Sequence, residues 1–436
     1  MHATPSKKRA DGPLAPLLQQ RKFRRLTFAR FTSRVAQNAL SFALVLLVVD
    51  ETGKAFFSSL LVLALVVPTT AAGIISGALS DAVPKRALML LGHGLRAGLC
   101  FSYAGSLDGA SDYFMIAVLM SVVNPLATSP EGASLPLIVD RQLLARANAI
   151  NQASTGLSQL IGFGLLTPLM LGFFESAEAL LWVCGGFFVL AAVNALFIGR
   201  IPSARRSEIG GEPEGRWYVV GWRALRSDRR VWQATVELTL ISVSIISLGG
   251  LIPTYLDEIL GLSVDVGVLV LVPAAAGVAI GLRLAGFLAH RVPHTLLSTS
   301  GFIVYVVALG IFASVNPVSE FLAGYEPFDW LATVDIGGFE GGAVVAMAVA
   351  FPLGFSFALV TVAAQTALND LVSLRLQGRA QATQGALAAL AASLPVLAAG
   401  VLADAIGVAP VIGGVAVVTG VLAIGRRGRH GLPSTS

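Results

Sequence analysis

Among the charged residues that lie inside otherwise apolar stretches of sequence, four have the side chains best suited to chemistry. They fall in three such stretches: Arg30 and Arg34 in 26–49, Glu131 in 112–138, and Glu237 in 231–256. A charge in hydrocarbon is costly, so ionisable residues there usually serve an ion or proton pathway. A carboxylate that is alternately dry and open to water can take up and release a proton. The pattern therefore favours proton exchange linked to the movement of a solute.

Polar residues continue the charged positions along one face of each predicted helix. Gln37 and Asn38 follow the two arginines at helical spacing, and Asn124 precedes Glu131 on the same face. Gln365 belongs to a further polar stripe in the segment 341–368. Such stripes match an inward, water-lined face. The predicted substrate and coupling site comprises Arg30, Arg34, Gln37, Asn38, Asn124, Glu131, Glu237 and Gln365.

A structural role is the alternative for each charge. Arg30 and Arg34 lie only one or two turns inside their segment, so they could extend to the lipid headgroups. Glu131 and Glu237 could form structural ion pairs. Arg96 lies near the middle of another apolar segment and is predicted to be a buried charge held in a structural bridge. Of the two acids, Glu131 is favoured for proton coupling, because its polar face extends deeper into the membrane.

The composition indicates an integral membrane protein. Hydrophobic residues make up 55% of the 436 residues and charged residues only 13%, whereas average soluble domains are about 25% charged. Twelve apolar segments are each long enough to cross a bilayer as a helix: 26–49, 57–79, 87–107, 112–138, 148–172, 178–199, 231–256, 266–289, 295–315, 341–368, 380–403 and 407–425. The predicted fold is therefore an all-α membrane protein with twelve transmembrane helices.

The positions of the basic residues predict how these helices are oriented. Of the 30 Lys and Arg residues, 25 fall in tails and loops on one side of the predicted membrane, and only Lys54 falls in a loop on the other. Basic residues accumulate in cytoplasmic loops. Both termini are therefore predicted to be cytoplasmic, in a cytoplasmic (inner) membrane. The net charge of +5 follows from this topology and does not indicate nucleic-acid binding.

Two similar halves are predicted from internal repeats. The stretch 286–293 echoes 77–84, and 379–384 echoes 146–152. Paired repeats of this kind are typical of transporters. The predicted organisation is an N-terminal tail (1–25), a six-helix half (26–199), a cytoplasmic linker (200–230), a second six-helix half (231–425) and a C-terminal tail (426–436).

A charged hinge between the second and third segments reads Gly77-Ala-Leu-Ser-Asp81-Ala-Val-Pro84-Lys85-Arg86. It resembles the loop motif of the major facilitator superfamily, from which Ala82 and Pro84 depart. The resemblance implies that a charge contact here locks the two halves on the cytoplasmic side. Glycine in the motif would also let two helix backbones approach closely. The implied conformational motif consists of Gly77, Asp81, Lys85 and Arg86.

Twelve helices, two halves and this motif together are similar to a major facilitator transporter over nearly the whole chain. The resemblance implies a central cavity that opens to each side in turn. The stretch from Leu135 to Gln152 is similar to the drug and macrolide efflux-like branch. Gly164-Leu-Leu-Thr167-Pro168 partly matches a signature of efflux antiporters, with Thr167 in place of a glycine. These similarities imply a secondary active transporter that exports small amphipathic or apolar compounds, coupled to protons.

Two alternatives to export stay open: import of a nutrient or organic ion, and a transport-inactive receptor or scaffold with the same fold. No phosphate-binding loop is present, and the five histidines lack metal-ligand spacing. The sequence therefore predicts no enzyme, cofactor or metal site. The predicted partners are a small-molecule substrate, protons or another coupling ion, and membrane lipids, and the protein is predicted to be a monomer.

Overall fold

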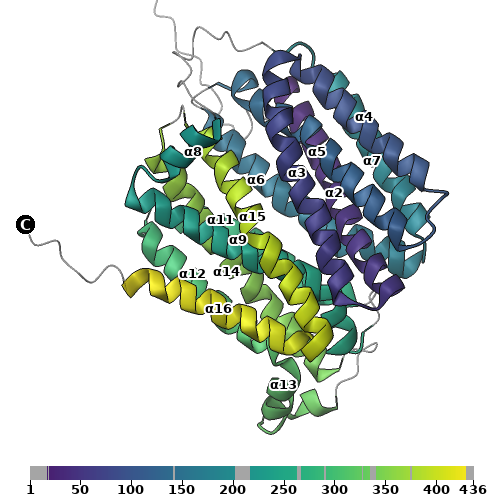
Figure 1. The fold of residues 1–436 in the computed structure, drawn as a ribbon, viewed down its shortest axis with the longest axis vertical. Helices are drawn as coiled ribbons and strands as arrows, with labels where there is room; N and C mark the ends of the chain where they lie inside the picture. The colour runs from purple at the N-terminus through teal and green to yellow at the C-terminus, as the bar shows by residue number, and fades with distance from the viewer. Residues whose placement is uncertain are drawn as a thin grey trace, which may run out of the picture.

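The computed structural model describes residues 17, 19–140, 143–201, 217–262, 267–288, 291–326, 328–333, 340–373 and 376–428. These residues form helices and the connections between them, and no β-strand occurs among them. The long helices gather into two bundles, one from each half of the chain (Figure 1).

The first bundle is built from six long helical segments (Figure 1). Their bounds are α2 (Arg21–Thr52), α3 (Ala55–Ala82), α4 (Lys85–Tyr103), α5 (Ala110–Ile138), α6 (Leu144–Ile161) with its π-helical continuations η2 (Gly162–Leu166) and η3 (Leu169–Phe173), and α7 (Ala177–Leu196). Each helix follows one of the apolar segments of the sequence, because a long apolar run in lipid satisfies its backbone hydrogen bonds by forming a helix.

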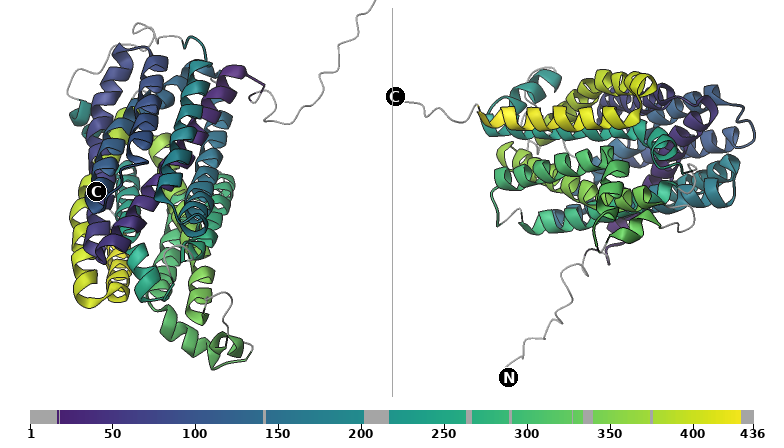
Figure 2. Two further views of the ribbon diagram at one scale, coloured as in Figure 1. Left: turned by 90° about the vertical axis from the view of Figure 1, so that its right-hand side faces the viewer. Right: turned by 90° about the horizontal axis from the view of Figure 1, so that it is seen from below.

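The second bundle also contains six long segments. Their bounds are α9 (Arg229–Glu258), η4 (Val268–Leu271) with α11 (Val272–Leu288), α12 (His294–Ala313), α14 (Gly341–Leu371), α15 (Gln377–Ile406) and α16 (Val408–Gly428). Three short helices lie outside these segments: α8 (Trp217–Leu225), α13 (Val315–Ala323) and η5 (Asp329–Ala332). α8 and α13 lie at opposite ends of the molecule (Figures 1 and 2), which are called the α8 end and the α13 end below.

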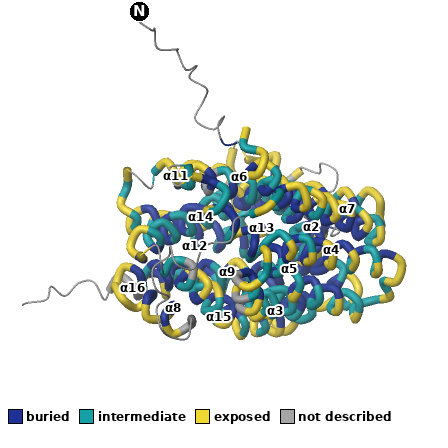
Figure 3. The backbone as a smooth tube through the Cα atoms, turned by 90° about the horizontal axis from the view of Figure 1, so that it is seen from above, coloured by how far each residue is buried: buried dark blue, intermediate teal, exposed yellow. Residues whose placement is uncertain are grey.

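The surface of the bundles is apolar, as expected for contact with lipid. Ten of the described helices are long and apolar enough to cross a membrane, and α4 and α16 lie beside them (Figure 1). Buried residues occupy the interior and exposed residues the perimeter (Figure 3). Large apolar side chains on that perimeter, such as Leu394, Val417 and Ile424, are mostly exposed. The predicted fold class, an all-α membrane protein of two six-helix bundles, is confirmed.

Small residues bring α11 and α14 into direct backbone contact. A Cβ atom at Gly277 would lie 2.2 Å from the carbonyl oxygen of Phe351, and one at Gly354 would lie 1.9 Å from that of Ala274. Any larger side chain at either glycine would force the two helices apart. Helices in membranes commonly associate by close approach through small residues, because burial of apolar surface provides no driving force for association in lipid.

The fifth long segment departs from a regular α-helix near its only proline. Around Gly162 the turn widens to π geometry, and a Cβ atom on this glycine would lie 2.7 Å from the Cβ of Asn38. Thr167 donates its hydroxyl to the carbonyl oxygens of Gly162 (2.9 Å) and of Ala39 on α2 (3.2 Å). Pro168 follows directly and lacks an N–H group, a common cause of local distortion in helices.

The two bundles contact each other at the α13 end, where α3 packs against α9 and α15. Asp404, near the end of α15, accepts hydrogen bonds from the backbone N–H groups of Ala55 (2.8 Å) and Phe56 (3.2 Å). Ser58 donates to the carbonyl oxygen of Gly250 on α9. The first N–H groups of a helix have no partner within it and attract negative charge. A carboxylate of the second bundle therefore caps a helix of the first.

Replacing this cap (Asp404→Ala) is expected to loosen the contact at the α13 end. Loss of an acidic cap costs about 1 kcal/mol, or roughly a fivefold shift in population. Ser59 is buried against Gly250 and Gly400. The thiol of a Ser59→Cys variant is therefore shielded while the two bundles are in contact and becomes accessible when they separate. In detergent, a maleimide should label it about fivefold faster when Asp404 is replaced. Asp257→Ala, at an exposed acid on α9, is the matched control, and equal labelling rates in both variants would contradict the capping role.

Candidate substrate and coupling site

Arg96 lies on the inward face of α4 and is fully buried. Its Nη1 donates to Asn124 Oδ1 (3.0 Å) and its Nη2 to Ser33 Oγ (2.8 Å). The same Nη2 lies 2.8 Å from His93 Nδ1, and the guanidinium carbon lies 4.5 Å from the centre of the Phe188 ring. A buried cation needs such partners because it has lost its hydration. The predicted buried charge is thus held by polar and aromatic groups.

The contacts of His93 define its protonation state. A guanidinium group can only donate hydrogen bonds, so His93 Nδ1 must accept from Arg96. A histidine that accepts at Nδ1 is neutral and carries its proton on Nε2. That nitrogen lies 3.1 Å from Glu131 Oε1, within hydrogen-bonding distance. Arg96 therefore holds His93 with its Nε2 beside the carboxylate of Glu131.

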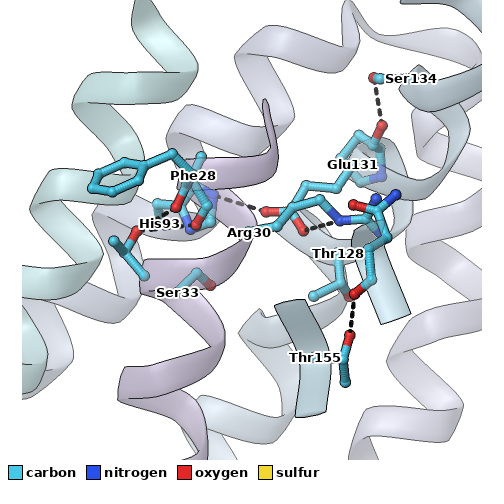
Figure 4. Close-up of polar contacts among 12 residues, drawn as sticks. Phe28, Arg30, Ser33, His93, Thr128, Glu131, Ser134 and Thr155 are labelled. Carbon is cyan, nitrogen blue, oxygen red and sulfur yellow. Dashed lines mark hydrogen bonds and ion pairs between the residues drawn. The ribbon is translucent and has the colours of Figure 1, made fainter. Parts of the chain in front are cut away.

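Glu131 is almost completely buried on α5 and lies between two helices that carry basic residues. Its Oε1 faces His93, and its Oε2 lies 3.7 Å from Arg30 Nε on α2. Figure 4 shows the carboxylate between these two side chains. A cation therefore lies on one side of the carboxylate and an imidazole on the other. A continuous polar chain thus runs through α4, α5 and α2.

One face of α2 leads from this chain to a more open region. Arg30, Arg34, Gln37 and Ser41 are all partly exposed, whereas residues 35, 36, 39 and 40 are buried. Gln37 donates to Ser41 Oγ (2.9 Å). Arg34 makes no hydrogen bond or ion pair with any residue that the structure describes. The helical spacing predicted from the sequence therefore places these residues on a single accessible stripe.

The remaining predicted site residues lie in different surroundings. The Cβ of Asn38 packs against Gly162 of η2. Glu237, on α9, is buried in the second bundle and accepts a hydrogen bond from Ser298 Oγ of α12 (2.6 Å). Gln365 is partly buried on α14. The structure thus joins Arg30, Asn124, Glu131 and Arg96 in one chain of contacts and gives Glu237 a partner on another helix.

The conformational motif lies where α3 ends and α4 begins. Lys85 Nζ donates to the carbonyl oxygen of Ser80 (3.2 Å). Arg86 is partly buried, and its Nε has no hydrogen-bond partner among the described residues. A Cβ atom at Gly77 would meet no atom within 4 Å, so the close helix approach expected there is absent from this structure. The side chain of Asp81 lies outside the described residues, and its locking role stays a prediction.

His93 is the residue of this site that sequence reasoning missed. The histidines were considered only as metal ligands, and His93 has no metal-ligand spacing to another histidine. The available signal was its position three residues before Arg96, which places both side chains on one face of a helix. A neutral histidine beside a buried arginine is an acceptor for it, and this role needs no metal.

A chain of ionisable side chains buried inside an apolar helical bundle is typical of multi-pass membrane proteins that move ions or solutes. The family model of the Major Facilitator Superfamily matches residues 26–351, and the chain belongs to this superfamily. Its members are transporters, so the protein is not an enzyme. The predicted superfamily is therefore confirmed, whereas the efflux-like branch stays a prediction. No curated protein sequence matches the chain.

Solved structures of transporters share this fold. A mutant of the nucleoside transporter NupG has a TM-score of 0.71 and 12% identity, covering 93% of this chain and 99% of its own. A mutant of the peptide transporter POT, in complex with sulfate, has a TM-score of 0.65 and 14% identity, covering 94% of each chain. At these identities the similarity concerns the fold alone.

Proposed function

We propose that the protein is a secondary active transporter that moves small amphipathic or apolar compounds and couples their movement to protons through Glu131. The observation that supports this role is the contact of Glu131 with His93 and Arg30. The carboxylate is buried, yet Arg30 belongs to the partly exposed stripe of α2. We place the protein in the cytoplasmic membrane as a monomer, with the α8 end and both termini on the cytoplasmic side.

The proposed coupling follows from the need of a buried carboxylate for compensation. Arg30 is the nearest cation to Glu131. When a solute on the α2 stripe draws Arg30 away, the carboxylate loses that cation in a dry environment. An uncompensated buried carboxylate is strongly destabilised, and a proton restores neutrality. Solute binding at Arg30 and proton binding at Glu131 are then linked, and each must raise the affinity for the other.

The direction of transport has two candidates. Export is supported by the similarity of residues 135–152 to the efflux-like branch. Import is supported by the Arg30–Glu131 contact. Because a solute that draws Arg30 away promotes protonation of Glu131, solute and proton bind together and move in the same direction. Export by antiport would instead require the two to compete.

Flux measurements in vesicles test the proposal. The purified protein is reconstituted, a pH gradient is imposed, and three fluorescent amphipaths are followed: anionic fluorescein, neutral coumarin and cationic ethidium. At least one dye should move faster than in protein-free vesicles, and nigericin, which collapses the pH gradient, should abolish the difference. Movement of dye and protons in opposite directions would indicate antiport, and movement in the same direction would indicate symport. No protein-dependent flux of any dye would contradict transport and favour a receptor or scaffold.

A further inference from the structure

We propose that Arg30 and Arg34 bind the anionic group of the transported solute, which is therefore an amphipathic organic anion such as a carboxylate. This inference rests on the proposed function, because it names the class of solute taken by the same site. Both arginines lie on the partly exposed stripe of α2, one helical turn apart.

The charges that surround Glu131 support an anionic ligand. From α2 it faces Arg30, and Arg34 follows one turn further along the same helix. From α4 it faces His93, which is neutral by its contacts, and Arg96 lies behind that histidine. Three guanidinium groups and a single carboxylate therefore lie in this region of α2, α4 and α5. Excess charge inside a membrane protein is costly, and an anionic solute would compensate it.

The other helices that pack against α5 do not supply the missing negative charge. α3 and α6 each carry one charged residue: Asp81, whose side chain lies outside the described residues, and Arg146, which is exposed. Both lie in the end turns of their helices, at the α8 end. The stripe of α2 lies deeper than either terminal turn. α9, which contacts α2, carries Glu237, whose carboxylate accepts from Ser298. Arg34 makes no ion pair with it or with any other described residue, so its compensation is left to whatever occupies the stripe.

Both arginines also have hydrogen-bond donors that no described residue accepts from. Arg30 Nε and Nη1 are buried without a hydrogen-bond acceptor in the described part of the chain. The 3.7 Å between Arg30 and Glu131 exceeds the roughly 2.7–2.9 Å of a charge-assisted hydrogen bond. Arg34 makes no hydrogen bond or ion pair with any described residue. Planar guanidinium groups match the two oxygens of a carboxylate better than an ammonium group does.

An organic anion, an inorganic anion and a lipid phosphate all share the chemistry that these donors recognise. The neighbourhood of the stripe favours the organic anion, because Phe31 and Phe42 are partly exposed on the same helix. An apolar body next to a charged group would contact both kinds of side chain. Linkage to Glu131 adds a second signature: a bound anion competes with Glu131 for Arg30, so it binds best when Glu131 is protonated.

Ligand-dependent thermal unfolding of the purified protein in non-ionic detergent tests this site without requiring transport. Benzoate is expected to raise the melting temperature, because a ligand of the folded state stabilises it by mass action. Benzamide and benzylamine, of similar shape but neutral and cationic, should not. Sodium phosphate and chloride measure inorganic anion binding. Arg34→Gln should weaken benzoate binding roughly tenfold or more, as expected for loss of one charged contact, and Arg34→Lys should restore only part of it.

The pH dependence of binding separates this role from a merely structural one. Benzoate remains ionised at pH 6 and pH 8, and the wild-type protein should bind it more tightly at pH 6. Glu131→Gln removes the competing carboxylate, so it should bind benzoate equally well at both pH values. Arg283→Gln, at an exposed arginine of α11 that has no partner among the described residues, is the matched control and should bind like the wild type.

Several results would overturn the assignment. They are absence of stabilisation by benzoate, equal stabilisation by benzamide, unchanged affinity in Arg34→Gln, and phosphate binding as strong as that of benzoate. The last would identify an inorganic or headgroup phosphate as the ligand. Benzoate binding without proton-driven flux would keep this site and reject the proposed coupling. Proton-driven flux of coumarin or ethidium without benzoate binding would keep the proposed coupling and reject the anion site.

Discussion

Glu131→Gln is expected to abolish proton-driven flux in reconstituted vesicles while leaving the protein folded. The glutamine side chain keeps an oxygen that can accept from His93, so the contact within the first bundle is retained. It cannot take up or release a proton, and the link between solute and pH gradient is lost. Flux of fluorescein down its own concentration gradient should persist, whereas acceleration by the pH gradient should disappear.

Glu237→Gln provides the comparison for this variant. Glu237 is also a buried acid in a membrane helix, but it accepts a hydrogen bond from Ser298 in the second bundle. Its replacement should leave the response to the pH gradient intact if Glu131 carries the proton. The opposite pattern would move the coupling role to Glu237. Wild-type, gradient-driven flux in both variants would refute proton coupling through either acid, and the charges would then form a structural network.

The helices of this protein were predictable because lipid imposes a simple rule on the sequence. A segment such as 26–49 is apolar enough to span a membrane, and the observed helix α2 (Arg21–Thr52) contains it and extends beyond it by less than two turns at either end. The π-helical turns around Gly162 were not predicted. They depend on how Thr167 and Pro168 fit against α2, which is a tertiary contact and leaves no periodic pattern.

The site was predictable only in part. The stripe of α2 follows from helical spacing alone, so Arg30, Arg34 and Gln37 were correctly placed on one face. The partner of Glu131 on α4 was missed. Two helices such as α4 and α5 can pack in several registers, and nothing in the sequence shows that residue 93 meets residue 131. The cap that Asp404 forms on α3 was missed for the same reason. Asp404 lies 349 positions from Ala55 and 348 from Phe56 in the sequence.

Arg96→Met is expected to cause the largest loss of stability among single changes in the site. Two opposing effects decide whether the free energy of unfolding rises or falls. Removing the cation relieves the cost of burying a charge, which is several kcal/mol. Against this, Asn124, Ser33 and His93 each lose a donor, at about 1–3 kcal/mol per unsatisfied buried group. Glu131 also loses a nearby cation. The second set of terms is larger, so we expect a net loss of about 3 kcal/mol.

Thermal unfolding in detergent measures this loss, and Arg283→Met on α11 is the control for removing an arginine from an exposed position. Arg96→Lys should recover only part of the stability, because a single ammonium group cannot reach acceptors on three sides.

The same variants test the orientation of His93. Without Arg96, His93 Nδ1 is free to take a proton, and a charged histidine would then hold Glu131 ionised and block its proton exchange. Arg96→Met should therefore also lose gradient-driven flux. A variant as stable as the wild type that nevertheless loses this flux would show that the cost of burying the charge cancels the contribution of its contacts, and that Arg96 serves transport and not stability.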